Sequence, residues 1–138
     1  MSHPLLDWQS LSADYAQYHQ TRGNQLCHLI GIPLIVLAVI AWTRLPVGNP
    51  IPLAAVALPV YFAWDLWLGL GMSASLAILT VLASRLPHGG ALGAFIAGWL
   101  FQLAGHRFFE GKSPAFTRNL AHLLVGPAWI LQKFIRPS

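Results

Sequence analysis

Histidines are the residues of this sequence best suited to chemistry. The chain has 138 residues, of which only 9% are charged, yet six are histidines. His19 and His28 flank the stretch "QTRGNQLC", whereas His106 and His122 come much later, in "FQLAGHRFFE" and "NLAHLLVGP". Imidazole nitrogens bind divalent metals such as Fe(II), Zn, Mn and Ni. If the fold brings these four side chains together, they are candidate ligands of a single metal ion.

His19 and His28 can share an ion only if the chain breaks between them. Nine residues at about 100° each would place the two side chains on opposite faces of one continuous α-helix. We expect Gly23 to end the first helix and Asn24 to cap the second. His28 then lies near the start of the second helix, and the chain can fold back so that both rings converge.

A second polar cluster surrounds His106. Gln102, His106 and Glu110 follow one another at intervals of four residues, so on an α-helix they stack along one face. Gly105 beside them would let another helix approach closely. Glu110 can orient an imidazole by accepting its N–H, or it can neutralise Arg107. The first interpretation makes Glu110 part of a metal site, and the second makes it part of a surface ion pair.

Each of these residues also has an ordinary structural interpretation. A single histidine near the end of an apolar helix is more often an interfacial or packing residue than a ligand, and burial is what favours function. Cys27 is the only cysteine, which excludes an internal disulfide and a thiolate cluster. Asp65 is the only acid within an apolar run. We expect it just before a turn at residues 69–71, where its carboxylate reaches the membrane surface or assists the metal site.

The composition is typical of a membrane protein. Apolar residues make up 56% of the chain and charged residues 9%, whereas soluble domains carry about 25% charged residues. The length allows one domain, residues 1–138. The net charge of +4 comes from scattered basic residues without a basic run, so no nucleic-acid partner is expected. Membrane lipid and an acidic substrate are the expected partners.

The hydrophobicity pattern predicts an all-α fold, an integral membrane bundle of about four transmembrane helices with interfacial helices at both ends. An amphipathic helix is expected at residues 5–20, and one or two interfacial helices at 114–135. Four apolar runs of roughly membrane-spanning length lie between them, at 29–45, 51–70, 72–86 and 91–109. The positive-inside rule then places both termini in the cytoplasm. Arg22, Arg107, Lys112, Arg118, Lys133 and Arg136 fall inside, and Arg44 and Arg85 fall outside.

Two stretches of the sequence resemble a known family. The first, "YAQYHQTRGNQLCHLIGIP", carries Tyr-x-x-Tyr-His followed by an asparagine, a second histidine and a proline. The second, "WLFQLAGHRFFEGKSPAFTRNLAHLLVGP", carries Gln-x-x-Gly-His-x-x-x-Glu, then Pro-Ala, Asn-Leu and Gly-Pro. In this order they are similar to the signatures of the small membrane 2-hydroxy fatty acid dioxygenases, which act in fungal phytosphingosine breakdown and have many bacterial relatives. The two motifs cover about a third of the chain.

The resemblance implies an Fe(II)-dependent reaction that needs no 2-oxoglutarate. A 2-hydroxy fatty acid and O2 would become the fatty acid one carbon shorter, carbon dioxide and water. The iron would be non-haem, and the location would be the bacterial inner membrane.

The resemblance also implies roles for individual residues. His19, His28 and His106 fall on the histidines of the family motifs as metal ligands, and Glu110 falls on the motif acid, with an expected catalytic role. His122 departs from the pattern, because the fungal enzymes carry Gln there, but its imidazole could complete a set of four ligands. The residues expected to surround the ligands are Tyr15, Asn24 and Gln102.

Two other functions are compatible with the same residues. A haem-binding membrane protein would use two of the histidines as axial ligands. A non-enzymatic membrane scaffold or metal carrier would tolerate exchange of His19, His28 and His106 for Gln with no loss of any activity. Di-iron desaturases and hydroxylases are disfavoured, because the sequence contains no HxxxH or HxxHH cluster.

Overall fold

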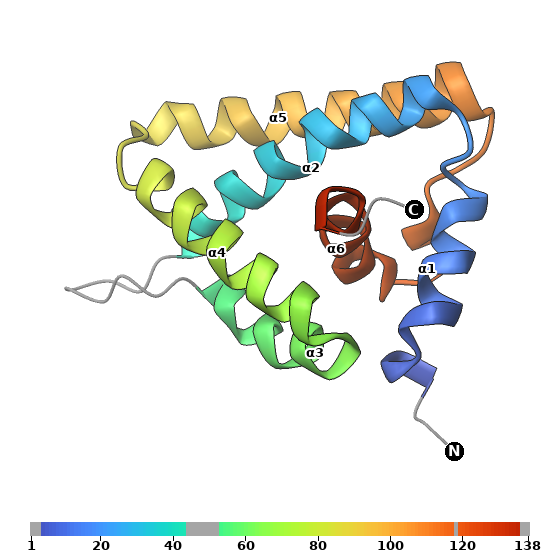
Figure 1. Ribbon diagram of the computed structural model, residues 1–138. Helices are drawn as coiled ribbons and strands as arrows, with labels where there is room; N and C mark the ends of the chain where they lie inside the picture. The colour runs from blue at the N-terminus through green and yellow to red at the C-terminus, as the bar shows by residue number, and fades with distance from the viewer. Residues whose placement is uncertain (1–3, 44–52, 118, 136–138) are drawn as a thin grey trace.

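The computed structural model describes residues 4–43, 53–117 and 119–135, and within these ranges it contains helices and no strands (Figure 1). The expected all-α fold is confirmed for this part of the chain. The elements are η1 (Pro4–Leu6), α1 (Trp8–Gln17), α2 (Arg22–Thr43), η2 (Leu53–Ala57), α3 (Leu58–Trp64), α4 (Leu66–Ala83), α5 (His88–Ala104), η3 (Gly105–Glu110), η4 (Ala115–Thr117) and α6 (His122–Ile135). Of these, η3 is a π-helix, and η1, η2 and η4 are short 3-10 helices.

Helices α2 and α5 form the most extensive helix pair of the fold, and they lie side by side in Figure 1. Helix α3 packs against α4 at one side of the bundle, and α1 packs against α6 at the other. An apolar cluster joins α1, α2 and α6, so these three helices meet close to the linker between α1 and α2. Its buried members are Leu11, Tyr15, Ile32, Val125, Trp129 and Ile130.

The break between the two N-terminal histidines lies earlier than expected. Helix α1 ends at Gln17, and α2 already begins at Arg22. Thr21 precedes α2, and its hydroxyl accepts the backbone N–H of Asn24 at 3.4 Å. The predictions that Gly23 ends one helix and that Asn24 caps the next are therefore wrong.

The second and third apolar runs are divided differently from the prediction. A turn is expected at residues 69–71, but α4 passes through this segment without interruption. The break lies at Asp65, whose backbone is extended and whose carboxylate accepts the N–H groups of Trp67 and Leu68 at 2.9 and 3.1 Å. Asp65 is thus the N-cap of α4. The glycine at position 69 serves packing, because a Cβ there would lie 2.3 Å from the ring of Phe62.

Glycines let α2 approach α5 and η3 closely. A Cβ at Gly98 would lie 2.8 Å from the carbonyl oxygen of Gly31, and a Cβ at Gly31 would lie 2.7 Å from that of Gly98. At Gly105, a Cβ would lie 2.4 Å from Oδ1 of Asn24 and 2.9 Å from Cβ of Cys27. The prediction that Gly105 admits another helix is confirmed. Small residues at such crossings are typical of helix pairs in membranes.

The free energy of unfolding of the Gly105→Ala variant is expected to be about 1–3 kcal/mol lower than that of the wild type, because the new methyl group must push α2 away from η3. The matched control is Gly93→Ala in α5, where a Cβ meets nothing within 4 Å. This control should be neutral or gain up to about 1 kcal/mol from the better helix propensity of alanine. Thermal unfolding followed by circular dichroism compares the two, and equal transition temperatures would contradict the tight crossing.

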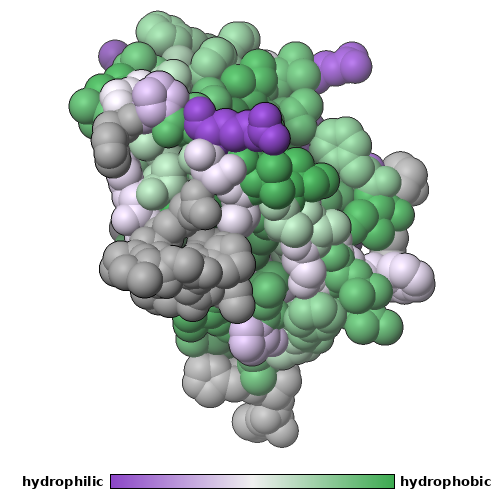
Figure 2. Space-filling view, turned by 90° about the vertical axis from the view of Figure 1, so that its left-hand side faces the viewer, coloured by the Kyte–Doolittle hydropathy of each residue, from purple (hydrophilic) through white to green (hydrophobic). Residues whose placement is uncertain are grey.

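Two helices are long and apolar enough to cross a membrane, Arg22–Thr43 and Leu66–Ala83. Only 22% and 28% of their apolar windows are buried inside the protein, so most side chains in these windows are at least partly exposed. Apolar side chains also cover much of the described surface that Figure 2 shows. These features favour an association with membranes.

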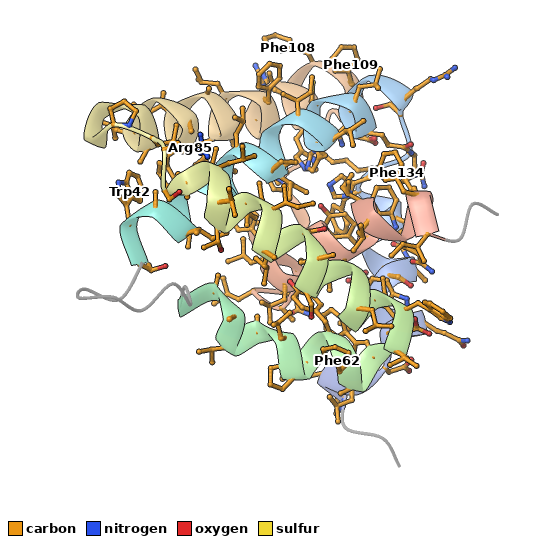
Figure 3. All side chains as sticks on the ribbon, turned by 60° about the vertical axis from the view of Figure 1, so that its left-hand side comes forward. Trp42, Phe62, Arg85, Phe108, Phe109 and Phe134 are labelled. Atoms are coloured by element: carbon orange, nitrogen blue, oxygen red, sulfur yellow. The ribbon has the colours of Figure 1, made fainter. Side chains whose placement is uncertain are left out.

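The two ends of the bundle carry different side chains. In Figure 3, Trp42 and Arg85 lie at one end, whereas Phe108, Phe109 and Phe134 project at the other. The α1–α2 linker and η3 lie at this second end of the bundle (Figure 1). Three basic residues that the sequence interpretation uses for orientation lie outside the described residues: Arg44, Arg118 and Arg136.

Candidate metal centre

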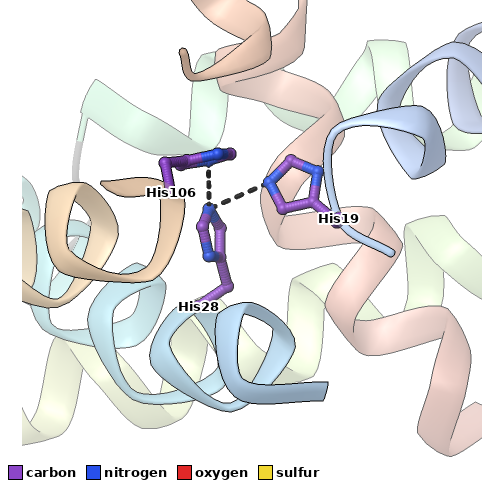
Figure 4. Close-up of side chains that lie close together, drawn as sticks. All are labelled: His19, His28 and His106. Atoms are coloured by element: carbon purple, nitrogen blue, oxygen red, sulfur yellow. Dashed lines mark hydrogen bonds between the residues drawn. The ribbon is translucent and has the colours of Figure 1, made fainter. Parts of the chain in front are cut away.

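Three histidine side chains meet in the interior of the protein (Figure 4). His19 lies in the linker between α1 and α2, His28 in α2, and His106 at the start of η3. Nε2 of His28 lies 2.9 Å from Nε2 of His19 and 3.1 Å from Nε2 of His106. One ring nitrogen of each residue lies within 4.8 Å of the others, and the side chains are only 2%, 1% and 2% exposed. The prediction that these rings converge is confirmed.

In His19 and His28, a backbone carbonyl determines which ring nitrogen is free to bind a metal. Nδ1 of His19 lies 2.7 Å from the carbonyl oxygen of Tyr15, and Nδ1 of His28 lies 2.9 Å from that of Asn24. A carbonyl oxygen can only accept, so both Nδ1 atoms carry the proton and both Nε2 atoms present a lone pair. Each carbonyl belongs to the fourth residue before its histidine. The local helical backbone therefore sets the orientation of both rings.

The contact between His19 and His28 is one that a bound cation would stabilise. Two imidazole lone pairs 2.9 Å apart repel each other unless a positive ion lies between them. A proton does not fill this role at neutral pH, because burial and the neighbouring His28 lower the pKa of His19 to about 3. A divalent metal does, since two nitrogens each about 2.0–2.1 Å from one ion can be up to about 4.2 Å apart. Both measured separations from His28, 2.9 and 3.1 Å, are shorter than this limit.

The donor set consists of three imidazoles. The group contains no carboxylate or thiolate among the residues that the structure describes. Nitrogen ligands of this kind suit iron, zinc, copper and nickel. Three protein ligands leave coordination positions open for other molecules, as catalytic metal sites do. These residues are therefore compatible with the expected Fe(II).

Glu110 is the last residue of the π-helix η3, which begins at Gly105. The N–H of Gly111 bonds to the carbonyl of His106 at 2.8 Å, with the five-residue spacing of a π-helix. A role in orienting an imidazole or in neutralising Arg107 is expected for Glu110 from the sequence. Oε1 of Glu110 instead accepts the backbone N–H and the hydroxyl of Thr21 at 2.6 and 2.9 Å.

Glu110 thereby fastens the linker that carries His19. Burial raises the pKa of Glu110, but hydrogen bonds, chiefly from Thr21, outweigh this effect and lower the pKa below its ordinary value. Glu110 is therefore ionised at neutral pH, and hydrogen bonds to an ionised acceptor are the stronger kind. In this structure Glu110 positions His19 through Thr21, and its catalytic role stays a prediction.

The Glu110→Gln variant is expected to lose about 1–2 kcal/mol of stability at pH 7, because the charged acceptor of two hydrogen bonds is replaced by a neutral one. The pKa of Glu110 is lowered by folding, so the wild-type advantage is complete above the unfolded pKa of about 4.3 and is lost as pH falls through the folded pKa. Chemical denaturation at pH 7, 5 and 3 measures this advantage. An advantage that does not shrink toward pH 3 would argue against the ionised contact.

The other residues expected around the ligands do adjoin the histidines. The ring of Tyr15 stacks on His19, with 3.9 Å between the ring centroids. Asn24 is fully buried, and its side-chain amide donates to the carbonyl of Tyr18 at 3.0 Å. Gln102 is buried and lines the same cavity as the three histidines.

His122 lies apart from the other three histidines. It does not belong to the ligand group that the described residues form, and its Nε2 lies 2.9 Å from Oδ2 of Asp14. His122 is nevertheless buried and lines the same cavity. Asp14 is not among the site residues that the sequence predicts. The role of His122 as a fourth ligand stays a prediction.

A cavity of about 90 Å³ adjoins the three histidines. Apolar side chains form most of its remaining wall, among them Ile35, Val36 and Trp99. Trp99 meets Phe116 edge to face, with 5.4 Å between the ring centroids. The cavity therefore combines metal-binding nitrogens with an apolar wall, which suits a ligand with a polar head and an apolar tail.

The fold and this site define an all-helical protein with a candidate three-histidine metal centre beside an apolar cavity. The chain belongs to the Mpo1-like family, because the family described as "2-hydroxy-palmitic acid dioxygenase Mpo1-like" matches residues 6–137. It is similar to the 2-hydroxy-palmitic acid dioxygenase MPO1 of Saccharomyces cerevisiae, with 32% identity over 145 residues that cover 98% of this chain and 83% of the yeast protein. No solved structure matches the chain. The resemblance drawn from two motifs is thus confirmed over nearly the whole length.

Proposed function

We propose that this protein is a non-haem Fe(II) dioxygenase that shortens 2-hydroxy fatty acids by one carbon. The reaction converts R–CH(OH)–COOH and O2 into R–COOH, CO2 and H2O. The observation that carries this proposal is the convergence of three buried imidazoles, with His28 at 2.9 and 3.1 Å from the other two. Membership of the Mpo1-like family and the similarity to the yeast dioxygenase support the substrate class.

His19, His28 and His106 would hold the iron. Bound iron supplies the redox chemistry for O2 and open positions for the α-hydroxy carboxylate. The carbonyls of Tyr15 and Asn24 hold Nδ1 of the two N-terminal rings, so the Nε2 atoms would be the ones that bind the ion. The apolar wall of the cavity excludes water from the reacting end of the substrate and accepts the first carbons of its acyl chain.

We further propose that the chain is an integral membrane protein of about four spans, with both termini in the cytoplasm of a bacterial cell. The outward-facing apolar side chains of α2 and α4 support insertion. Basic side chains gather around the α1–α2 linker: Lys112 donates to the carbonyl of Gln17 at 3.3 Å, and Lys133 donates to Gln25 at 3.2 Å. The positive-inside rule then places the metal centre at the cytoplasmic face.

The test is O2 consumption by anaerobically purified, iron-loaded protein. With 2-hydroxypalmitate we expect one CO2 and one pentadecanoic acid for each O2, whereas palmitate and 3-hydroxypalmitate should give none. Iron-replete protein that leaves 2-hydroxypalmitate intact would contradict the proposed reaction.

The site geometry disfavours the haem alternative. A haem places a flat macrocycle between two axial histidines, but here a third imidazole occupies the same small space. An intense Soret band in the purified protein would nevertheless overrule this argument.

A further inference from the structure

A second hollow lies outside the metal centre, between the start of α2 and the end of α6. Its volume is about 160 Å³. The apolar side chains of Leu26, Leu29, Ile130 and Phe134 form its floor, and Arg22 and Lys133 supply two positive charges. Phe134 projects from the bundle at this point in Figure 3 and is 66% exposed. We call this hollow the basic groove.

The ammonium of Lys133 is held in place at the basic groove. Its Nζ donates to Oε1 of Gln25 at 3.2 Å and lies 4.1 Å from the centroid of the Trp129 ring. Gln25 is itself fixed, because its amide donates to the carbonyl of His19 at 2.7 Å. Neither contact neutralises the charge of Lys133. The groove therefore presents a positioned cation rather than a freely moving one.

The four acidic side chains of the chain are engaged elsewhere. The sequence contains only four acidic residues against eight basic ones. Asp7 and Asp65 accept backbone N–H groups at the starts of α1 and α4, Asp14 faces His122, and Glu110 binds Thr21. In the described parts of the chain, no ion pair joins a carboxylate to a lysine or arginine. The two charges of the basic groove are thus available to an external anion.

We infer that the basic groove binds an anionic phospholipid. Arg22 and Lys133 would contact its phosphate, because Arg and Lys are the side chains that bind phosphate oxygens most strongly. The exposed side chains of Leu26 and Phe134 would contact its acyl chains. The apolar floor beside the two cations matches an amphiphilic anion. A small soluble anion would contact the cations but would leave the apolar floor uncovered. The inference rests on the proposed membrane location and is independent of the proposed reaction.

Native mass spectrometry of delipidated protein tests this site. The probes are phosphatidylglycerol and phosphatidylcholine with identical acyl chains, added in equal amounts. We expect one phosphatidylglycerol to be retained, with an affinity roughly 10- to 30-fold higher than that of phosphatidylcholine, since each basic residue near an anionic lipid contributes about fivefold. Equal retention of both lipids by the wild type would overturn the inference without the need for any variant.

Paired variants locate the site. The double variant Arg22→Gln/Lys133→Gln should lose the preference for phosphatidylglycerol, whereas the matched control Arg107→Gln/Lys112→Gln should keep it. The control removes two cations from the same end of the protein, but outside the lining of the basic groove. If both double variants lose the preference equally, diffuse surface charge explains the binding and the groove is not the site. Because lipid retention needs neither iron nor turnover, failure of the proposed reaction would leave this result unchanged.

Discussion

Iron content and turnover should both be lost when His28 is replaced by alanine. The Nε2 atom of His28 is the centre of the group, 2.9 Å from that of His19 and 3.1 Å from that of His106. Without it, the two remaining nitrogens cannot hold the ion in a defined geometry. We expect metal affinity to fall by more than about 100-fold, since even the loss of a residue that only supports a ligand costs about 10- to 100-fold. Elemental analysis of anaerobically purified protein and the release of CO2 from 2-hydroxypalmitate measure both effects.

The matched control for this experiment is His88→Ala. His88 begins α5, which has 17 residues, so it lies about 25 Å along the helix axis from the end that leads to His106. The control should keep its iron and its activity. If His28→Ala retains stoichiometric iron, the three histidines are a packing group and the proposed metal centre is wrong.

Removal of the metal should destabilise the wild-type protein strongly. A ligand that binds only the folded state stabilises it by about 4 kcal/mol at a concentration 1,000-fold above its dissociation constant. Removal would also restore the unfavourable contact between the lone pairs of His19 and His28. We therefore expect the transition temperature to fall by several degrees after anaerobic treatment with a chelator and to recover when Fe(II) is added back.

The His28→Ala variant serves as the reference for the chelator experiment. Its transition temperature should not respond to the chelator or to Fe(II), because the variant has no complete site. An identical response in the wild type and the variant would show that the chelator acts elsewhere. No response in either would mean that the ion contributes nothing to folding.

The helical fold and the three histidines that converge could be predicted from the sequence because their signals are local. Long apolar runs specify helices in a chain with few charges, and histidines are conspicuous among them. His19, His28 and His106 each stand in a motif with a recognisable spacing. The break between His19 and His28 could also be predicted, because nine residues of one continuous α-helix would place the two side chains on opposite faces.

The position of that break could not be predicted, because it depends on a distant residue. Thr21 precedes α2 while its N–H and hydroxyl bind Glu110, which is 89 residues away. Gly23 and Asn24 are locally better helix signals, but this remote contact determines the outcome. The break before α4 was also misplaced, at residues 69–71 instead of at Asp65. The carboxylate of Asp65 caps α4, and the glycine at position 69 makes room for the ring of Phe62 instead of forming a turn.

The hydrogen-bond partner of Glu110, Thr21, could not be predicted either. The four-residue spacing of Gln102, His106 and Glu110 describes an α-helix, whereas the chain forms a π-helix from Gly105 to Glu110. Nothing in the residue types of this segment indicates a π-helix. The contact between Asp14 and His122 was unpredictable for another reason, because it joins helices whose packing arises only in the folded state.

The three proposed ligands come from distant parts of the chain, and this separation would restrict when the protein can acquire an ion. His19 and His28 are synthesised early, but His106 follows 78 residues after His28. The nascent chain at the ribosome therefore holds at most two of the three nitrogens until its last quarter has emerged. In the proposed membrane-bound metalloprotein, metal loading would be a late step of biogenesis, which would follow the insertion of α2 and α4 and would join the first and last parts of the polypeptide.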